Sequence, residues 1–213
     1  MKLYDTERSG NCYKVRLMLS LLGISYESVP VDLARGDQRK PEFLALNPRG
    51  QVPVLEDGAV RVWDSMAILM YLARRYGGET WLPLEAQPMA EVMQWLAVSE
   101  NEILYGLVPA RAIRLGRREG DPAPYQQTGR QALAVLEQRL ARRDWLALDR
   151  LTIADVACYP YVALAPESGV PLDEYPAVRA WIARIQALPG HTPLPGKAGT
   201  DASSASGAQR AGS

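Results

Sequence analysis

The pattern of apolar residues changes near residue 77, and no other feature of the chain constrains its fold as strongly. Before this point, short strand-like stretches alternate with helical ones, and Asp57-Gly58 between two apolar stretches is a strong hairpin signal. From residue 87 to about 188, apolar residues recur at helical spacing without a hairpin signal. The sequence therefore predicts a mixed α/β domain over residues 1–77, a linker over 78–86 and an all-helical domain over 87–195.

The order of elements in the first domain narrows the fold further. Strands are expected at residues 2–4, 26–32, 54–56 and 60–63, and helices at 11–22, 41–46 and 64–77. This β-α-β-α-β-β-α order, with one hairpin and two crossovers, describes a small mixed sheet covered by helices. It is the thioredoxin-like arrangement, so the predicted fold class is α/β followed by all-α.

The second domain contains its own start and stop signals. Thr152 and Asp155 have the spacing of a capping-box variant that opens a helix. Pro109 follows an apolar stripe and is expected to bend or break its helix. A last helix is expected at about residues 175–188. The tail, residues 196–213, is rich in Ala, Ser and Gly, which predicts disorder.

The net charge and the small numbers of His and Cys argue against several classes of function. The 24 Lys+Arg residues balance 24 Asp+Glu, so no nucleic-acid or membrane partner is expected. One His and two Cys are too few for a zinc site, which usually takes three or four such ligands, and no metal is predicted. They also argue against a catalytic triad, because His191 would have to be its base.

The expected location follows from the same residues. The first eight residues lack the apolar region of a secretory signal, and no apolar run approaches the roughly 18–20 residues of a membrane span. Cys12 and Cys158 lie far apart and indicate no disulfide framework. We therefore expect a soluble cytoplasmic protein whose thiols are reduced and pack in the core.

The first of three polar segments lies between the first strand and the first helix. Ser9 and Asn11 precede the helix, where free backbone N–H groups favour a bound anion. Either residue could instead be a plain N-cap. The segment alone does not decide between the two interpretations.

The other two segments flank the hairpin. Pro53 directly precedes a strand, and a cis bond there would turn the backbone of Val52 outward to pair with a peptide-like ligand. Asp64 and Ser65 open the next helix, either as a plain cap or as a site for a ligand with both an ammonium and a carboxylate group. Asp64 would then hold the cation and Ser65 the anion.

These three segments and the Thr152/Asp155 cap, in this order, resemble a cytosolic glutathione S-transferase over roughly residues 1–190. The resemblance is to bacterial members of the serine type, theta- or nu-like. It implies a glutathione-binding first domain, glutathione as cosubstrate without a metal, and a homodimer.

The resemblance assigns the parts of the glutathione site. Asp64 stands where the family, often with Glu, holds the γ-glutamyl end, and Val52 matches the residue whose backbone pairs with the cysteinyl unit. Gln38 falls where some members have His near the glycyl end, and Lys40 is either a cation for the glycyl carboxylate or a solvated lysine. The residues implied to bind glutathione are Gln38, Lys40, Gln51, Val52, Pro53, Asp64 and Ser65.

The thiol of glutathione has two candidate contacts, Ser9 and Asn11. Ser9 stands where serine-type members place the hydroxyl that donates to the sulfur, whereas nu-like disulfide-bond oxidoreductases place an Asn near it. A thiol of pKa about 8.5 is only a few per cent ionised at pH 7. Lowering that pKa by roughly two units takes about 2.7 kcal/mol, which a charge-assisted hydrogen bond and a helix N-terminus supply together.

The second substrate, a small electrophile, is expected between the domains. Tyr105, Leu107 and Arg111 are the candidates to line its pocket, with plain helix packing or solvated surface as the alternative for each. The implied function is a detoxifying glutathione transferase that joins the glutathione thiolate to a small, mostly apolar electrophile. A glutathione-dependent disulfide-bond reductase and a non-catalytic interaction module are the alternatives, and the retained ligand-binding residues argue against the module.

Overall fold

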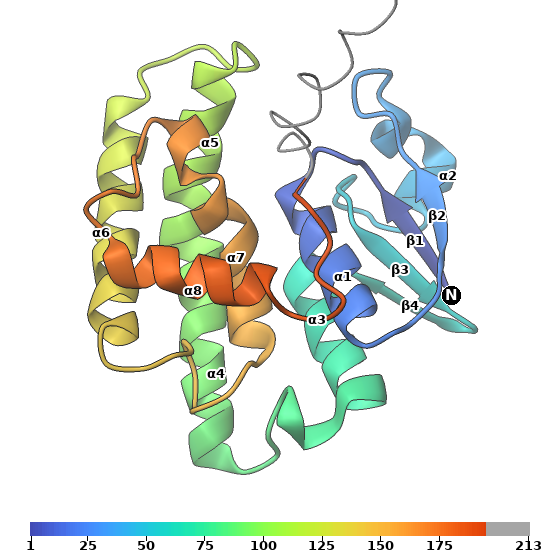
Figure 1. Cartoon of the computed structure of the whole chain (residues 1–213). Coiled ribbons are helices and arrows are strands. Elements are labelled where there is room, and N and C mark those ends of the chain that lie inside the picture. The colour runs from blue at the N-terminus through green and yellow to red at the C-terminus, as the bar shows by residue number, and fades with distance from the viewer. Residues whose placement is uncertain (195–213) are drawn as a thin grey trace, which may run out of the picture.

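The computed structural model describes residues 1–194, and its first domain is built on a four-stranded mixed sheet of order β2-β1-β3-β4 (Figure 1). Strands β1 (Lys2–Asp5) and β2 (Glu27–Pro30) are parallel, whereas β3 (Val54–Asp57) is antiparallel to both β1 and β4 (Val60–Trp63). The predicted hairpin at Asp57-Gly58 is confirmed, with Gly58 at φ 59°. The thioredoxin-like fold of this domain is therefore confirmed.

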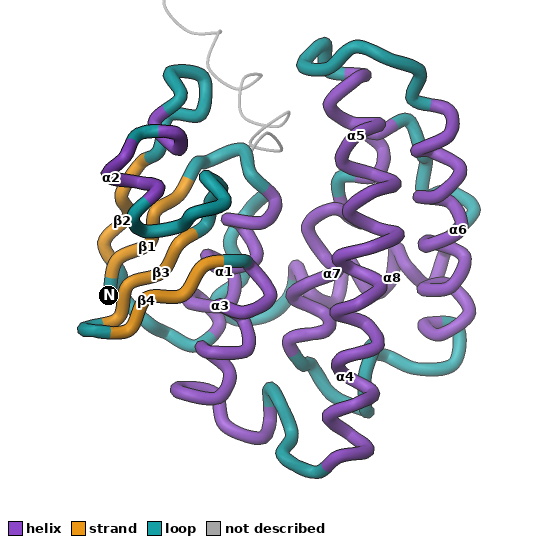
Figure 2. The backbone as a smooth tube through the Cα atoms, turned by 180° about the vertical axis from the view of Figure 1, so that it is seen from behind, coloured by secondary structure: helices purple, strands orange, loops and turns teal. Residues whose placement is uncertain are grey.

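Helices cover both faces of this sheet. Helices α1 (Gly10–Leu21) and α3 (Ser65–Leu72) lie between the sheet and the second domain. Figure 2 shows, from behind, that the short α2 (Pro41–Leu44) lies on the opposite face. There Phe43 packs with Val31 and Val54 in a small separate core.

The second domain is helical, as predicted. The long helices are α4 (Ala86–Val98), α5 (Leu104–Arg114), α6 (Ala123–Leu140), α7 (Ile153–Ala163) and α8 (Pro176–Gln186). A π-helical turn, Ser99–Ile103, connects α4 to α5. Of the two outcomes expected at Pro109, a bend or a break, the break does not occur, because α5 continues through it to Arg114. Every residue of α7 is buried, so this helix forms the centre of the domain.

Short helical turns complete the chain. A π-helical turn, Ala73–Gly77, extends α3 to the end of the predicted helix. Single 3₁₀ turns lie at Asp37–Arg39, Gly78–Thr80 and Ala165–Ser168. The linker predicted over residues 78–86 thus contains one of these turns, and α4 begins at its last residue.

The start of α7 confirms the predicted cap. The Asp155 Oδ2 accepts from the Thr152 N–H at 3.0 Å, and the Thr152 hydroxyl accepts from the Ala154 N–H at 3.2 Å. The Asp155 Oδ1 also accepts from the Leu146 N–H and the Trp181 indole N–H, both at 3.0 Å. Burial raises the pKa of Asp155 to about 6, although the hydrogen bonds oppose this shift. The carboxylate thus joins α7, α8 and the preceding loop.

The last described residues run along α1. The Ser20 hydroxyl donates to the Gly190 carbonyl at 2.6 Å, and the Tyr13 hydroxyl donates to the Thr192 carbonyl. The His191 Nε2 lies 3.0 Å from the Tyr159 hydroxyl of α7, and burial lowers the pKa of this histidine. The sheet domain therefore contacts the end of the helical domain through α1 (Figure 1). The tail predicted to be disordered, residues 196–213, lies outside the described residues.

Candidate active site

The register of the sheet brings the three polar segments to one edge. Tyr4 of β1 pairs with Val54 of β3, which pairs with Trp63 of β4. The chain leaves β1 and β4 and enters β3 at this edge, so the segments that hold Ser9, Pro53 and Asp64 are neighbours. The antiparallel pairing of β3 with β1 and β4 therefore brings the three polar segments together.

Ser9 is the N-cap of α1. Its Oγ accepts from the Cys12 N–H at 3.2 Å, as in the plain-cap interpretation. A hydroxyl has one proton and can accept and donate at the same time. The cap uses only an acceptor position, so the Ser9 proton can still be donated to an anion at the positive end of the helix. The cap and the ligand interpretations are therefore compatible.

Asn11 lies in the first turn of α1, next to the buried Tyr161 of α7. Its side-chain Oδ1 is buried and has no hydrogen-bond partner among residues 1–194. The Tyr161 ring is packed so tightly here that a Cβ on Gly10 would lie 2.5 Å from its Cε1. Tyr161 thus holds the first turn of α1 in place, a contact that local sequence patterns did not indicate.

The Val52-Pro53 peptide bond is cis, as the sequence suggested. Pro53 is buried and Val52 is half-buried. The backbone N–H and C=O of Val52 make no hydrogen bond within the part of the chain that the structure describes. They are therefore free to pair with an extended ligand that lies along this edge.

Asp64 opens α3 with a backbone φ of 80°, a conformation that L-residues rarely adopt. Its Oδ1 accepts from the Met66 N–H at 3.0 Å and from the Ala67 N–H at 3.4 Å. Its Oδ2 forms an ion pair with Arg49 at 3.0 Å, and Ser65 beside it is buried. The contact of Arg49 with Asp64 depends on tertiary structure and was not predicted.

The residues expected at the glycyl end lie on neighbouring loops. A Cβ on Gly50 would lie 3.0 Å from the Gln38 carbonyl oxygen, so the loops that hold these residues touch. The Gln38 Oε1 is buried without a partner among the described residues, and the Gln51 side chain is exposed. Lys40 is exposed and its Nζ lies 2.6 Å from Asp37, which raises the pKa of the lysine.

The three residues predicted to line the acceptor pocket do not form one group. Tyr105 is 65% exposed, whereas Leu107 is 1% exposed and lies in the core. The Leu107 side chain packs against Gly129 of α6, so the prediction that it lines an open pocket is wrong. Arg111 is held by Glu167 at 2.7 Å. The helical spacing of these residues did not indicate which of them face α6, and this is why the three differ in exposure.

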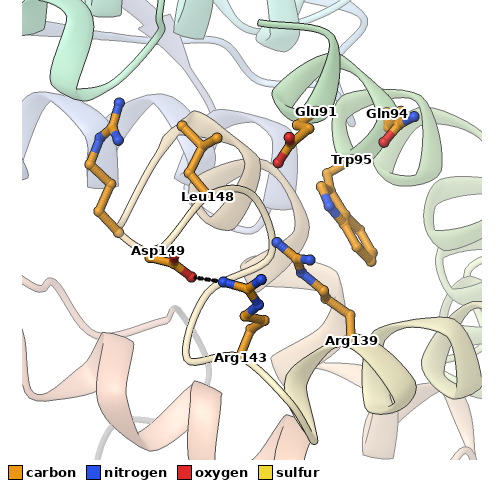
Figure 3. Close-up of a pocket in the computed structure, with 8 residues that line it drawn as sticks. Glu91, Gln94, Trp95, Arg139, Arg143, Leu148 and Asp149 are labelled. Carbon is orange, nitrogen blue, oxygen red and sulfur yellow. Dashed lines mark hydrogen bonds and ion pairs between the residues drawn. The ribbon is translucent and has the colours of Figure 1, made fainter. Parts of the chain in front are cut away.

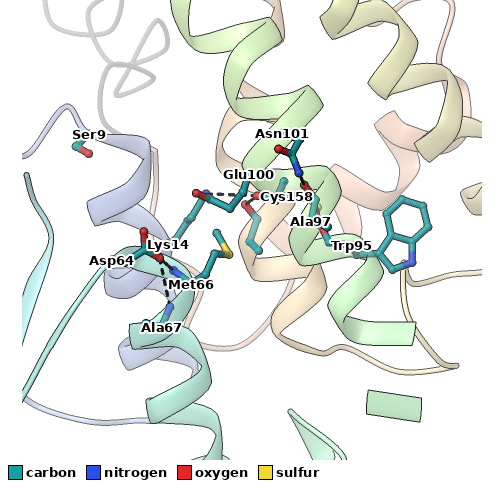
Figure 4. A network of polar contacts seen from close by, with 12 residues as sticks. Ser9, Lys14, Asp64, Met66, Ala67, Trp95, Ala97, Glu100, Asn101 and Cys158 are labelled. Atoms are coloured by element: carbon teal, nitrogen blue, oxygen red, sulfur yellow. Dashed lines mark hydrogen bonds and ion pairs between the residues drawn. The ribbon is translucent and has the colours of Figure 1, made fainter. Parts of the chain in front are cut away.

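A buried lysine joins the two domains behind the site. Figure 4 shows Lys14 extending from α1 towards Glu100 in the π-helical turn. The Lys14 Nζ lies 3.3 Å from the Glu100 Oε1 and 3.4 Å from the Ser99 Oγ. Burial lowers the pKa of Lys14, and Glu100 partly opposes this shift. The pair was not predicted, because its members are far apart in the sequence.

Comparisons with known proteins agree with this geometry. Residues 1–74 match the family profile "Glutathione S-transferase, N-terminal domain", and residues 104–189 match "Glutathione S-transferase, C-terminal domain". The chain is 36% identical over 187 residues to a maleylacetoacetate isomerase of Pseudomonas aeruginosa, covering 84% of this chain and 88% of that one. The chain belongs to the glutathione S-transferase family.

Two further proteins are similar to this glutathione S-transferase. It is 31% identical over 193 residues to the disulfide-bond oxidoreductase YfcG of Escherichia coli, covering 84% of this chain and 87% of that one. A crystal structure of a glutathione S-transferase from Pseudomonas fluorescens matches it with a TM-score of 0.84 and 40% identity, covering 91% of this chain and 98% of that one. The family, the two-domain fold and the class of enzyme predicted from the sequence are thereby confirmed.

Other reactive groups of this glutathione S-transferase are engaged in packing. Cys12 is fully buried, which raises the pKa of its thiol to about 12, and its side chain packs in the core. The Tyr4 hydroxyl donates to Glu56 at 3.0 Å. Within residues 1–194, no three His, Cys, Asp or Glu side chains form a group that could hold a metal, and no helix is long and apolar enough to cross a membrane.

Proposed function

We propose that the protein is a glutathione transferase that joins the sulfur of glutathione to a small, mostly apolar electrophile, with Ser9 as the thiolate contact. The carrying observation is that the Ser9 Oγ accepts the Cys12 N–H at 3.2 Å, which leaves the hydroxyl proton available at the N-terminus of α1. The proposal is further supported by the register that brings Val52 and Asp64 to the same edge.

The proposed reaction needs little from the protein beyond stabilising a thiolate. Glutathione loses its thiol proton to solvent, and the Ser9 hydroxyl donates a hydrogen bond to the resulting sulfur anion. The thiolate then attacks an electrophilic carbon. A C–S bond forms, and a leaving group such as chloride departs with the bonding electrons.

The remaining contacts would hold the tripeptide in register. The free N–H and C=O of Val52 pair with the cysteinyl unit, and the Asp64 carboxylate takes the γ-glutamyl ammonium. Ser65 receives the γ-glutamyl carboxylate at the start of α3. Gln38, Lys40 and Gln51 are proposed for the glycyl end, where Lys40 would exchange Asp37 for the ligand carboxylate. Tyr105 and Arg111 remain candidates for the acceptor side.

The test compares Ser9→Ala with Asn11→Ala in conjugation of 1-chloro-2,4-dinitrobenzene. Loss of one charge-assisted hydrogen bond, about 1.5–3 kcal/mol, is expected to lower kcat/KM of Ser9→Ala roughly ten- to hundredfold. The pKa of bound glutathione, read from thiolate absorbance, should rise in the same variant. If Ser9→Ala conjugates normally while Asn11→Ala does not, the assignment of Ser9 is wrong.

Disulfide reduction is the second candidate, favoured by one observation at the same site. The Asn11 Oδ1 is buried without a partner among the described residues, so the carboxamide is not committed to packing. The likeness to YfcG supports the same reading. Reduction of hydroxyethyl disulfide by glutathione, measured on both variants, separates the candidates. Activity that depends on Asn11 and not on Ser9 would favour the reductase.

We also infer that the protein forms a homodimer and works in the cytoplasm. The single chain exposes large apolar side chains on both domains, including Trp63 and Met93, which a second copy would cover. Both cysteines are free and buried, as in proteins of a reducing compartment. Sedimentation velocity that shows only monomer at micromolar concentration would contradict the dimer.

A further inference from the structure

One charged side chain close to the proposed glutathione site, Lys14, is wholly shielded from water. It follows Ser9 on α1 after little more than one helical turn, and its side chain has no exposed surface. Its Nζ lies 3.3 Å from the Glu100 Oε1 and 3.4 Å from the Ser99 Oγ. Burying an ammonium group is costly. The proposed reaction does not yet give this buried charge a role.

The titratable groups that face Lys14 come from three other elements. Tyr161 and Cys158 lie on α7, and the Lys14 Nζ stands 5.3 Å from the centre of the Tyr161 ring. Burial raises the pKa of both groups, so neither is charged at neutral pH. Burial lowers the pKa of Lys14, whereas the carboxylates of Glu100, in the π-helical turn, and Asp64, at the start of α3, oppose this shift. Two carboxylates therefore support the ammonium form of Lys14 (Figure 4).

Burial makes the field of this ammonium different from the field of the two carboxylates. Charges in the protein interior are screened less than charges in contact with water. The Lys14 side chain is fully buried, whereas the Glu100 and Asp64 side chains are both partly exposed. Water therefore weakens the two negative charges more than the positive one. A net positive potential is left around the first turn of α1.

Figure 3 shows the opposite case, an ion pair at the surface of the helical domain. Arg143 pairs with Asp149 beside a pocket, and both side chains are exposed. Water and salt screen both charges of such a pair, so its field is weak beyond a Debye length. The degree of burial thus decides how far a paired charge acts, and Lys14 lies at the buried extreme.

The position of Lys14 on α1 directs its field towards Ser9. In a helix the Cα–Cβ bonds tilt towards the N-terminus, so the Lys14 side chain leans towards the end that Ser9 caps. The rise of about 1.5 Å per residue separates the two residues by about 7.5 Å along the axis. A sulfur held by the Ser9 hydroxyl would therefore lie on the order of 10 Å from the ammonium.

We propose that the buried Lys14 ammonium stabilises the thiolate of glutathione from a distance, without touching either substrate. Because this role requires glutathione at Ser9, it rests on the proposed function. Lys14 then adds a fixed positive charge to the hydrogen bond from Ser9 and to the N-terminus of α1. At an effective dielectric constant of about 20–40, a unit charge about 10 Å away shifts the pKa of a thiol by roughly 0.6–1.2 units.

The test measures the thiol pKa of glutathione bound to the full chain, from thiolate absorbance, and the pH profile of kcat/KM for conjugation. Lys14→Met keeps the length of the side chain but removes its charge, so the bound pKa should rise by roughly 0.6–1.2 units. Below this pKa kcat/KM should fall roughly four- to fifteenfold, and above it the loss should disappear. Lys14→Arg keeps the charge and should retain the wild-type profile. Lys14→Gln replaces Lys14→Met if that variant does not fold.

Two controls separate the charge from the structure around it. Lys2→Met makes the same substitution at an exposed lysine of β1 and should leave the bound pKa unchanged. Ser99→Ala removes a hydrogen-bond partner of Lys14 without changing any charge. It also removes the hydrogen bond from Ser99 to the Ala157 carbonyl, so it should lower stability but not shift the pH profile.

The possible failures can be told apart. An unchanged bound pKa in Lys14→Met, a loss of activity that is equal at every pH, or an equal shift in Ser99→Ala would each overturn the role of Lys14. A shifted profile in Lys14→Arg would do the same. Wild-type protein that does not lower the thiol pKa of glutathione at all would instead contradict the proposed function, and the role of Lys14 with it.

Discussion

The Lys14 Nζ, fully buried in α1, lies 3.3 Å from the Glu100 Oε1, and this ion pair connects the sheet domain to the helical domain. The Glu100 side chain remains 31% exposed. The two partners are therefore not equivalent: Lys14 depends on Glu100 for its charge, whereas water can reach Glu100 without Lys14.

This asymmetry predicts unequal effects on stability. Glu100→Gln leaves a buried ammonium without a counter-charge and should lower the free energy of unfolding by about 3 kcal/mol. Lys14→Met removes the buried charge itself and should cost only about 1 kcal/mol, because Glu100 stays hydrated. Urea unfolding at pH 7 measures both values.

The pH dependence of the Glu100→Gln variant provides a control. Burial lowers the pKa of Lys14 in the folded state, so the unfolded chain binds the extra proton at high pH. Stability should therefore rise with pH as Lys14 deprotonates, and the deficit of Glu100→Gln should shrink between pH 7 and 10. A deficit that stays constant would mean that the Lys14 charge is not its cause.

Asp64→Asn separates the cap from the proposed ammonium site. Asn keeps the Oδ1 acceptor for the Met66 N–H and tolerates a positive φ, so folding stability should change by less than about 1 kcal/mol. The lost charge should raise KM for glutathione roughly ten- to hundredfold. Steady-state kinetics and thermal melts on one preparation test both. An unchanged KM would remove Asp64 from the binding site.

Gly10→Ala tests the contact between α1 and α7. The new Cβ would lie 2.5 Å from the Tyr161 ring, so the helices must shift, at a cost of about 1–3 kcal/mol. The shift moves Ser9 as well, and KM for glutathione should rise. The double variant Gly10→Ala/Tyr161→Leu removes the obstructing ring and should be less destabilised than the sum of its single variants. Additive effects would locate the cost elsewhere.

The raised pKa of Asp155 predicts that the free energy of unfolding depends on pH between 4 and 7. Its folded pKa of about 6 lies above its unfolded value, so the folded state holds the proton more tightly. Proton binding by Asp155 therefore stabilises the folded state. This stabilisation is fully present below pH 4 and is lost as the pH rises through 6. The unfolding free energy of wild type, relative to Asp155→Asn, should therefore fall by about 2–3 kcal/mol between pH 4 and 7. A flat difference would show that Asp155 titrates normally.

Local sequence patterns were sufficient to predict most elements of the fold. The hairpin, the start of α1 after Ser9 and the cap at Thr152 each depend on a few adjacent residues, and all three were predictable. The absence of a break at Pro109 has a non-local origin. A proline weakens a helix locally, but packing of α5 against α6 at Gly106 and Gly129 holds the helix together past it.

The sequence predicted the site residues that lie at the ends of strands and helices, but not the side-chain contacts between separate segments. Val52 and Asp64 lie next to strand ends and Ser9 lies at a helix start, and such boundaries can be placed from the sequence. Arg49 on Asp64, Tyr161 on Gly10 and Glu100 on Lys14 are contacts between separate segments of the chain. Such contacts leave no pattern in the local sequence. Two of them are ion pairs, and the packing of Tyr161 orients α1, which begins after Ser9.

The segment that runs along α1 after α8 has a consequence for protein engineering. Tyr13 and Ser20 of the first domain hydrogen-bond to residues 192 and 190 at the far end of the chain. A fragment cut at residue 77 would expose this side of α1, and a chimera that borrows the helical domain of a relative would have to borrow a matching α1 as well. A unit exchanged between relatives must therefore keep α1 together with the segment at residues 190–192 that it binds.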